Sequence, residues 1–139
     1  MAQDYTETVR AIYKAFATGD IPFVLGIFDP QIVWNEAEHF VYADGNPYVG
    51  PQAILNGVFA HLGADWDNFS ATSEELVSAG ETVVSFGRYR ATFKKNAAAV
   101  NAQFVHVFKF KDGKLVRFQQ YTDTAQFREV VNRGKSASA

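Results

Sequence analysis

The chain has 139 residues, of which 47% are hydrophobic and 15% aromatic, enough for one domain with a self-sufficient core. Its formal net charge is −2 and it has no long basic run, which argues against nucleic-acid binding, because such binding depends on neutralising phosphates. The lack of cysteine excludes disulfides, cysteine-based zinc sites and thiol nucleophiles.

No apolar run approaches the length of about 18 residues that a membrane span needs. The start of the sequence also lacks the basic and apolar regions of a signal peptide. We therefore expect a cytoplasmic protein that binds neither nucleic acid nor membrane.

Two helices are predicted at the start of the chain. Apolar residues recur at helical spacing over residues 4–18, namely Val9, Ile12, Tyr13 and Phe16. Asp20 can cap a second, shorter helix with Pro22 in its first turn. Asp29-Pro30 ends that helix, because proline disfavours a helical conformation at the residue before it.

A strand is predicted over residues 31–36, with Ile32 and Trp34 on one face. It leads into a connection over residues 37–49, which is long enough to be a lid or binding loop, or else the tip of a wandering hairpin. Gly50-Pro51 opens a third helix, which ends at Gly63.

From Trp66 onward a period of two predicts a run of strands, over residues 67–79, 81–94, 101–111 and 114–122. Asp123 begins a last helix to about Arg133, and residues 134–139 are predicted to be a flexible tail. Because the strands are grouped and most helices precede them, the order predicts one α+β domain over residues 1–133. Helices would pack on a curved, mostly antiparallel sheet that encloses a small-molecule pocket.

Five segments carry a resemblance that covers nearly the whole chain. They are YKAFATGD (13–20), GPQAI (50–54), GRYR (87–90), HVFKFKDGK (106–114) and QYTDT (120–124). In this order and spacing they resemble the NTF2-like superfamily, specifically its ketosteroid isomerase and SnoaL-like polyketide cyclase branch. The resemblance implies a cone-shaped, cystatin-like fold with an internal pocket. It does not determine the function, because the family hosts many activities.

Glu36 is the first candidate base. It ends a predicted strand at the mouth of an apolar pocket, where desolvation raises the pKa of a carboxyl group toward neutrality. The resemblance implies the same role, since Phe28 and Glu36 have the spacing between a phenylalanine and the general-base aspartate of ketosteroid isomerases. Glutamate has the longer side chain, so the substrate can differ. The alternative is a solvated glutamate at a strand end.

His106 is the candidate oxyanion donor or acid. It shares a strand face with Phe104, Phe108 and Phe110 and so points into an apolar space, where an imidazole can donate a hydrogen bond to a developing enolate. The resemblance implies that it takes the place of the protonated aspartate in the isomerase oxyanion hole, and it also resembles the pocket histidine of SnoaL-like cyclases. The alternative is a core histidine satisfied by a polar neighbour.

Asp123 is the second candidate base. The resemblance implies this role, because SnoaL-like cyclases have an acid/base aspartate near this place. The alternative is a helix cap, since Gln126 follows three residues later as in a capping box. Tyr13 is either a pocket hydroxyl or a core residue. It lies one residue out of register with the oxyanion tyrosine of the isomerases, which argues against steroid isomerisation.

The remaining candidate substrate-binding residues are large or polar side chains predicted to form the pocket wall: Trp34, Tyr48, Phe59, Tyr89, Phe104, Phe108, Gln119 and Tyr121. The sequence has no His-x-His or HExxH pattern, so we expect no metal site. It also lacks the Arg-x-Asp motif of the limonene epoxide hydrolases of this superfamily.

The leading hypothesis is a cofactor-independent enzyme of the isomerase, cyclase or lyase type. It would bind a small, largely apolar carbonyl compound and move a proton through an enol or enolate, with Glu36 or Asp123 as base and His106 as donor. One alternative is a non-catalytic binding or association module. The other is a structural homodimer with a core filled by side chains. The family resemblance implies a homodimer, and the outer sheet face with Val105 and Val107 could form it.

Overall fold

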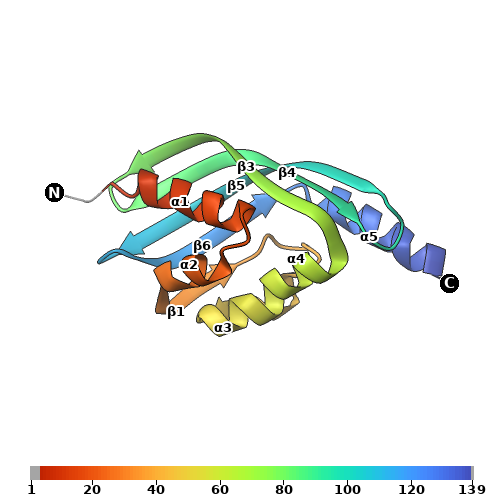
Figure 1. Ribbon diagram of the computed structural model, residues 1–139, viewed down its shortest axis with the longest axis horizontal. Helices are drawn as coiled ribbons and strands as arrows, with labels where there is room; N and C mark the ends of the chain where they lie inside the picture. The colour runs from red at the N-terminus through yellow and green to blue at the C-terminus, as the bar shows by residue number, and fades with distance from the viewer. Residues whose placement is uncertain (1–3, 139) are drawn as a thin grey trace.

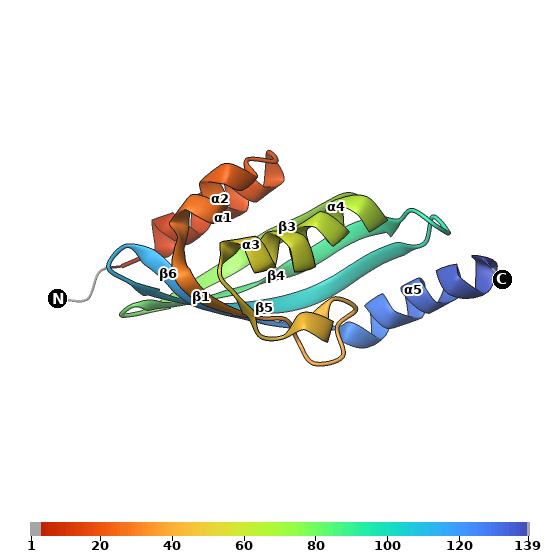
Figure 2. The ribbon, with the colours of Figure 1, turned by 90° about the horizontal axis from the view of Figure 1, so that it is seen from below.

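The computed structural model describes residues 4–138. Four helices lie on one face of a curved sheet and a fifth extends past its end (Figure 1, Figure 2): α1 (Thr6–Ala17), α2 (Ile21–Ile27), α3 (Pro51–Ile54), α4 (Ala60–Asp65) and α5 (Thr124–Ser138). The sheet consists of β1 (Phe28–Asn35), β2 (Tyr48–Val49), β3 (Trp66–Ala79), β4 (Thr82–Phe93), β5 (Ala99–Lys111) and β6 (Lys114–Thr122). The predicted α+β class, with helices on a curved and mostly antiparallel sheet, is confirmed.

The strand order is β2-β1-β6-β5-β4-β3. β1 runs parallel to β6, and the other neighbouring strands are antiparallel. This order places Asn35 opposite Gln119, and on the next pair of strands Gln120 opposite His106. The end of the first strand, where Glu36 follows, is therefore close to the middle of β5.

The core lies between the helices and the inner face of the sheet. The predicted stripe of α1 is buried at Val9 and Ile12, and alternate residues of β5 are buried from Phe104 to Phe110. A helix period of 3.6 and a strand period of two each place one apolar face toward the same interior. Among residues 4–138, no helix has the length and apolar character needed to cross a membrane.

The first strand and the connection after it differ from the prediction. β1 begins at Phe28, so Pro30 lies within it, in a stretch where the pairing with β6 is irregular between Phe28 and Val33. A proline is tolerated there because it breaks no regular ladder hydrogen bond. The connection over residues 37–49 contains a 3₁₀ turn, η1 (Ala43–Gly45), and the short strand β2, which pairs with β1.

Two helices also differ. The third predicted helix contains a π-helical turn, η2 (Leu55–Phe59), between α3 and α4. The last helix is longer than predicted, because α5 continues through Gly134 to Ser138. Glycine is a weak helix former, yet a single one does not end a helix. Ala139 lies outside the described residues.

Candidate functional site

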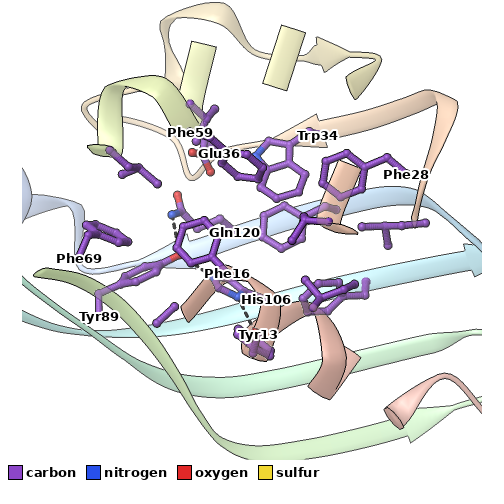
Figure 3. Close-up of a pocket in the computed structure, with 18 of the residues that line it drawn as sticks. Tyr13, Phe16, Phe28, Trp34, Glu36, Phe59, Phe69, Tyr89, His106 and Gln120 are labelled. Carbon is purple, nitrogen blue, oxygen red and sulfur yellow. Dashed lines mark hydrogen bonds between the residues drawn. The ribbon is translucent and has the colours of Figure 1, made fainter. Parts of the chain in front are cut away.

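An apolar cavity lies between the helices and the inner face of the sheet, with about 70 Å³ of free space. Aliphatic and aromatic side chains from α1, β1, η2 and the inner strands form most of its wall. The side chains that can form hydrogen bonds in this wall are Tyr13, Trp34, Glu36, Tyr89, His106 and Gln120 (Figure 3). A few polar groups converge on an otherwise apolar space, as is usual in small-molecule sites.

His106 is held by two tyrosines. Its Nδ1 lies 2.7 Å from the hydroxyl of Tyr13, its Nε2 lies 2.5 Å from that of Tyr89, and Phe104 stacks on the ring with centroids 3.9 Å apart. Burial lowers the pKa of His106 to about 3, so the imidazole is neutral at ordinary pH. His106 lines the cavity as predicted, but both nitrogens are engaged. The expected direct hydrogen bond from His106 to a ligand would require one tyrosine hydroxyl to give up its hydrogen bond with the imidazole.

The hydrogen bonds around His106 leave one hydroxyl proton free. A neutral imidazole donates from one nitrogen and accepts at the other, so one tyrosine donates to His106 and the other accepts from it. Gln120 Nε2 donates to Tyr89 over 2.9 Å, and the Gln120 carbonyl accepts from the Ala37 N–H over 3.1 Å. The tyrosine that accepts from His106 keeps its own proton, which is available to a ligand. Burial raises the pKa of both tyrosines above the ordinary value, so they remain protonated.

Glu36 follows β1 and is only 3% exposed. Burial raises the pKa of its carboxyl group to about 8, and the nearby indole N–H of Trp34 opposes this rise. The two side chains do not meet hydrogen-bond geometry, and no group within residues 4–138 donates a hydrogen bond to the carboxyl. Glu36 can therefore hold or release a proton near neutral pH while facing an apolar space.

Asn46 fixes the backbone at Glu36. Its Oδ1 accepts from the Glu36 N–H and its Nδ2 donates to the Glu36 carbonyl, each over 2.9 Å. The connection over residues 37–49 thus folds back on the end of β1 and fixes the backbone position from which the Glu36 side chain extends. Sequence analysis missed this residue, because Asn46 lies within the connection over residues 37–49 and carries no signal of its own there.

The structure brings most of the predicted site residues together. Those that line the cavity are Tyr13, Trp34, Glu36, Phe59, Tyr89, His106 and Phe108. Phe104 is buried behind His106 and supports it without lining the cavity. Tyr48 is buried in the core, where its hydroxyl donates to the Tyr42 carbonyl over 2.6 Å, and it does not line the cavity either.

Asp123 does not line the cavity. Its Oδ1 accepts from the Gln126 N–H over 3.2 Å, and its Oδ2 accepts from the Gln126 side chain over 3.3 Å. These contacts correspond to the helix-cap alternative. Of the two candidate bases, the structure places only Glu36 at the cavity.

Gln119 and Tyr121 also lie outside the cavity, and their neighbour Gln120 lines it instead. The pairing of β5 with β6 is irregular, because Lys109 pairs with Arg117 while Phe110 pairs with Leu115. Such a bulge reverses which residues face inward beyond it. A strict alternation from Leu115 would turn Gln119 and Tyr121 inward, whereas the bulge turns Gln120 inward.

Several further residues of the cavity wall were also missed. Each of them is a phenylalanine on the inner side of the fold: Phe16, Phe28, Phe40, Phe69 and Phe118. Phe16 could have been found from its place on the apolar stripe of α1. Within residues 4–138, no group of three or more His, Cys, Asp or Glu side chains is arranged to hold a metal ion.

Comparison with known proteins places this geometry in a family. The SnoaL-like domain matches residues 9–118. An NTF2-like protein from Burkholderia thailandensis shares 29% identity over 93% of this chain and 98% of its own, with a TM-score of 0.87. TerC, crystallised with polyporic acid, shares 26% identity over 91% of this chain and 96% of its own, with a TM-score of 0.80.

A protein from Catenulispora acidiphila with a ketosteroid isomerase-like fold, in complex with trimethylamine, has a TM-score of 0.75. At 17% identity over 88% of this chain and 89% of its own, it supports the fold alone. None of the curated proteins matches the sequence. The family match and these structures agree with the predicted branch, and the chain belongs to the SnoaL-like family, with the NTF2-like fold.

Proposed function

We propose that the chain binds a small, largely apolar carbonyl compound in this cavity and moves a proton through an enol or enolate. It would thus act as an isomerase, cyclase or lyase without a cofactor. The observation that carries this proposal is Glu36, a carboxyl group buried in an apolar wall with no hydrogen bond from residues 4–138 and a pKa of about 8. A carboxyl group with a pKa near the working pH suits proton transfer.

Glu36 is the base in this proposal. Its carboxylate removes a proton from the carbon next to the carbonyl, so the C–H bond breaks and an O–H bond forms on Glu36. The electron pair moves onto the carbonyl oxygen, and the proton returns to the same or to another carbon. The steps need no other reactant. Because the pKa of Glu36 is about 8, the ionised fraction and the rate rise as the pH approaches that value.

The polar wall around His106 positions the ligand. The Tyr89 hydroxyl oxygen and the Gln120 amide are held by hydrogen bonds that reach back to the Ala37 backbone. Such fixed dipoles in an apolar cavity stabilise charge without having to reorganise. His106 therefore acts through its tyrosines and does not itself form a hydrogen bond with the ligand.

The free volume limits the ligand. About 70 Å³ lies well below the 300–1,000 Å³ of pockets for drug-sized molecules. A compact ring compound thus needs only local movement of the wall, and a larger one needs a side chain such as Phe59 to move. Phe59 belongs to the π-helical turn η2, a kind of irregularity that is frequent at functional sites. The co-crystallisation of TerC with polyporic acid supports an organic ligand here.

Exchange of the α-protons of cyclohexanone for deuterium, followed by NMR, tests the proposal. We expect the wild-type protein to accelerate the exchange and Glu36→Gln to lose about 100-fold of that acceleration. Glu38→Gln is the matched control, because Glu38 is an exposed glutamate two residues further on. A wild-type rate no higher than that of buffer, or a Glu36→Gln rate equal to the wild type, would contradict the proposal.

A non-catalytic binding module is the second candidate. It is favoured by the small cavity and by the engagement of both His106 nitrogens. Binding of cyclohexanone without accelerated exchange would favour this candidate over the enzyme.

A further inference from the structure

The indole N–H of Trp34 has no acceptor in hydrogen-bond geometry within residues 4–138, although the Glu36 carboxyl lies near it. Trp34 Nε1 is the one fully enclosed side-chain polar atom of that part of the chain without a hydrogen-bond partner. Trp34 is 8% exposed and lines the cavity. Trp66 offers a direct comparison, because its Nε1 donates to the Tyr42 hydroxyl over 2.9 Å. Buried donors are nearly always paired, so an unpaired one requires an explanation.

The packing around Trp34 holds its ring in one orientation. The ring stacks on Phe118 with centroids 3.8 Å apart, and Phe59 meets it edge-on at 5.6 Å. Figure 3 shows the nitrogen on the side of the ring that faces Glu36. Because the aromatic neighbours hold the ring plane, the N–H points along one direction within the cavity wall.

Trp34 lies beside the candidate base. The two residues are two positions apart at the end of β1, and both line the cavity. His106 lies on β5, two strands from β1, since β6 lies between them. A carbonyl oxygen lies two bonds from the carbon that Glu36 deprotonates, so it stays on the side of the cavity that Glu36 and the Trp34 indole share.

We infer that the Trp34 indole N–H binds the carbonyl or enolate oxygen of the ligand and makes the cavity selective for oxygenated molecules over hydrocarbons of the same shape. This inference rests on the proposed function for its ligand class. It assigns the contact with the reacting oxygen to Trp34, where sequence analysis assigned it to His106. An indole can only donate, so the ligand group must be an acceptor.

The indole N–H signals in a proton–nitrogen NMR spectrum test the inference directly. The chain has two tryptophans, so Trp66 serves as the internal reference and the Trp34→Phe spectrum assigns the signals. We expect cyclohexanone to move the Trp34 proton signal downfield and to leave that of Trp66 in place. Methylenecyclohexane, which has a CH₂ group in place of the oxygen, should bind without that downfield shift.

Affinity gives the second readout. Trp34→Phe keeps an aromatic ring against Phe118 and removes the donor. It should weaken cyclohexanone binding about tenfold, as expected for the loss of one hydrogen bond, and change methylenecyclohexane binding less than about twofold. Trp66→Phe is the matched control and should preserve the preference for the ketone.

The outcomes separate the two proposals. A Trp34 shift without proton exchange would support this inference and contradict the catalytic proposal. Exchange that depends on Glu36, together with an unmoved Trp34 signal, would overturn the inference alone. Equal losses of binding affinity for cyclohexanone and methylenecyclohexane in Trp34→Phe would overturn the inference as well. If neither probe binds, the ligand class and the inference fail together. The wild-type spectrum decides the matter even if Trp34→Phe does not fold.

Discussion

The side chain of Asn46 forms two reciprocal hydrogen bonds, each of 2.9 Å, with the backbone N–H and carbonyl of Glu36. A residue ten positions further along the chain thus fixes the starting point of the one carboxyl group that lines the cavity. The carboxyl itself has no such support within residues 4–138, so its position depends on this backbone contact.

We predict that Asn46→Ala lowers the free energy of unfolding by about 2 kcal/mol, the sum expected for two hydrogen bonds. It should also slow proton exchange more than it weakens ligand binding, because the base is then less well placed. Asn46→Asp keeps the acceptor and loses the donor. Its stability and exchange rate should therefore lie between those of the wild type and of Asn46→Ala. Urea denaturation and exchange kinetics measure these effects. Unchanged exchange in Asn46→Ala would mean that Asn46 supports the loop only.

The stability of the protein should depend on the protonation of Glu36. Its pKa is raised from 4.5 to about 8, so the folded state keeps a proton that the unfolded state releases. Stability is then fully present below pH 4.5 and declines as the pH rises to 8, by at most about 1.4 kcal/mol per pH unit. Glu36→Gln should lack this decline, whereas the control Glu38→Gln should keep it. Denaturation curves across this pH range provide the measurement.

Protonation of His106 should change the stability in the opposite direction, with stability rising as the pH rises, and at lower pH. Its pKa is lowered from 6.5 to about 3, so between these values the unfolded state binds a proton that the folded state rejects. Stability is therefore lost as the pH falls through this window. NMR of the imidazole nitrogens should show a neutral ring down to about pH 4. A ring that becomes protonated near pH 6.5 would contradict the burial of His106.

The two tyrosines that hold His106 should differ in importance. Tyr89→Phe leaves the buried groups Gln120 Nε2 and His106 Nε2 without their partner, and should cost about 2–3 kcal/mol of stability. Tyr13→Phe removes a single hydrogen bond at a less buried position and should cost about 1 kcal/mol. Thermal denaturation of the two variants tests the order. Equal costs would indicate that Tyr89 does not connect the two side chains.

Homodimerisation through the outer sheet face remains a prediction. Phe86 and Tyr121 lie on that face with exposures of 39% and 55%, and both pair with Val105 on the central strand. An exposed apolar area of this kind favours association with a second copy. Sedimentation analysis should find a dimer for the wild type and a monomer for Phe86→Arg. A wild-type protein that sediments as a monomer would contradict the prediction.

The fold could be predicted where one side of an element faces water and the other the core. The stripe of α1 and the alternation in β4 and β5 come from that asymmetry, so local periodicity was sufficient. The same reasoning placed His106 in an apolar space, whereas the choice of Glu36 came from its place at a strand end and from the family resemblance.

The errors concern features that depend on pairing between distant segments. The bulge in β6 is defined by its register with β5, so Gln119 and Tyr121 were predicted on the wrong side and Gln120 was missed. The hydrogen bonds of Asn46 and the tyrosines around His106 join residues far apart in the chain. The capping pair Asp123–Gln126, in contrast, is local, and its pattern was visible in the sequence.

The parallel pairing of β1 with β6 has a consequence for biosynthesis. Glu36 is made in the first third of the chain, whereas Gln120, which completes the opposite side of the cavity, is among the last residues of the final strand. The helices and the antiparallel hairpins can form as they leave the ribosome, but the site requires the most distant contact in the sheet. We therefore expect the apolar cavity to be completed only after β6 has left the ribosome.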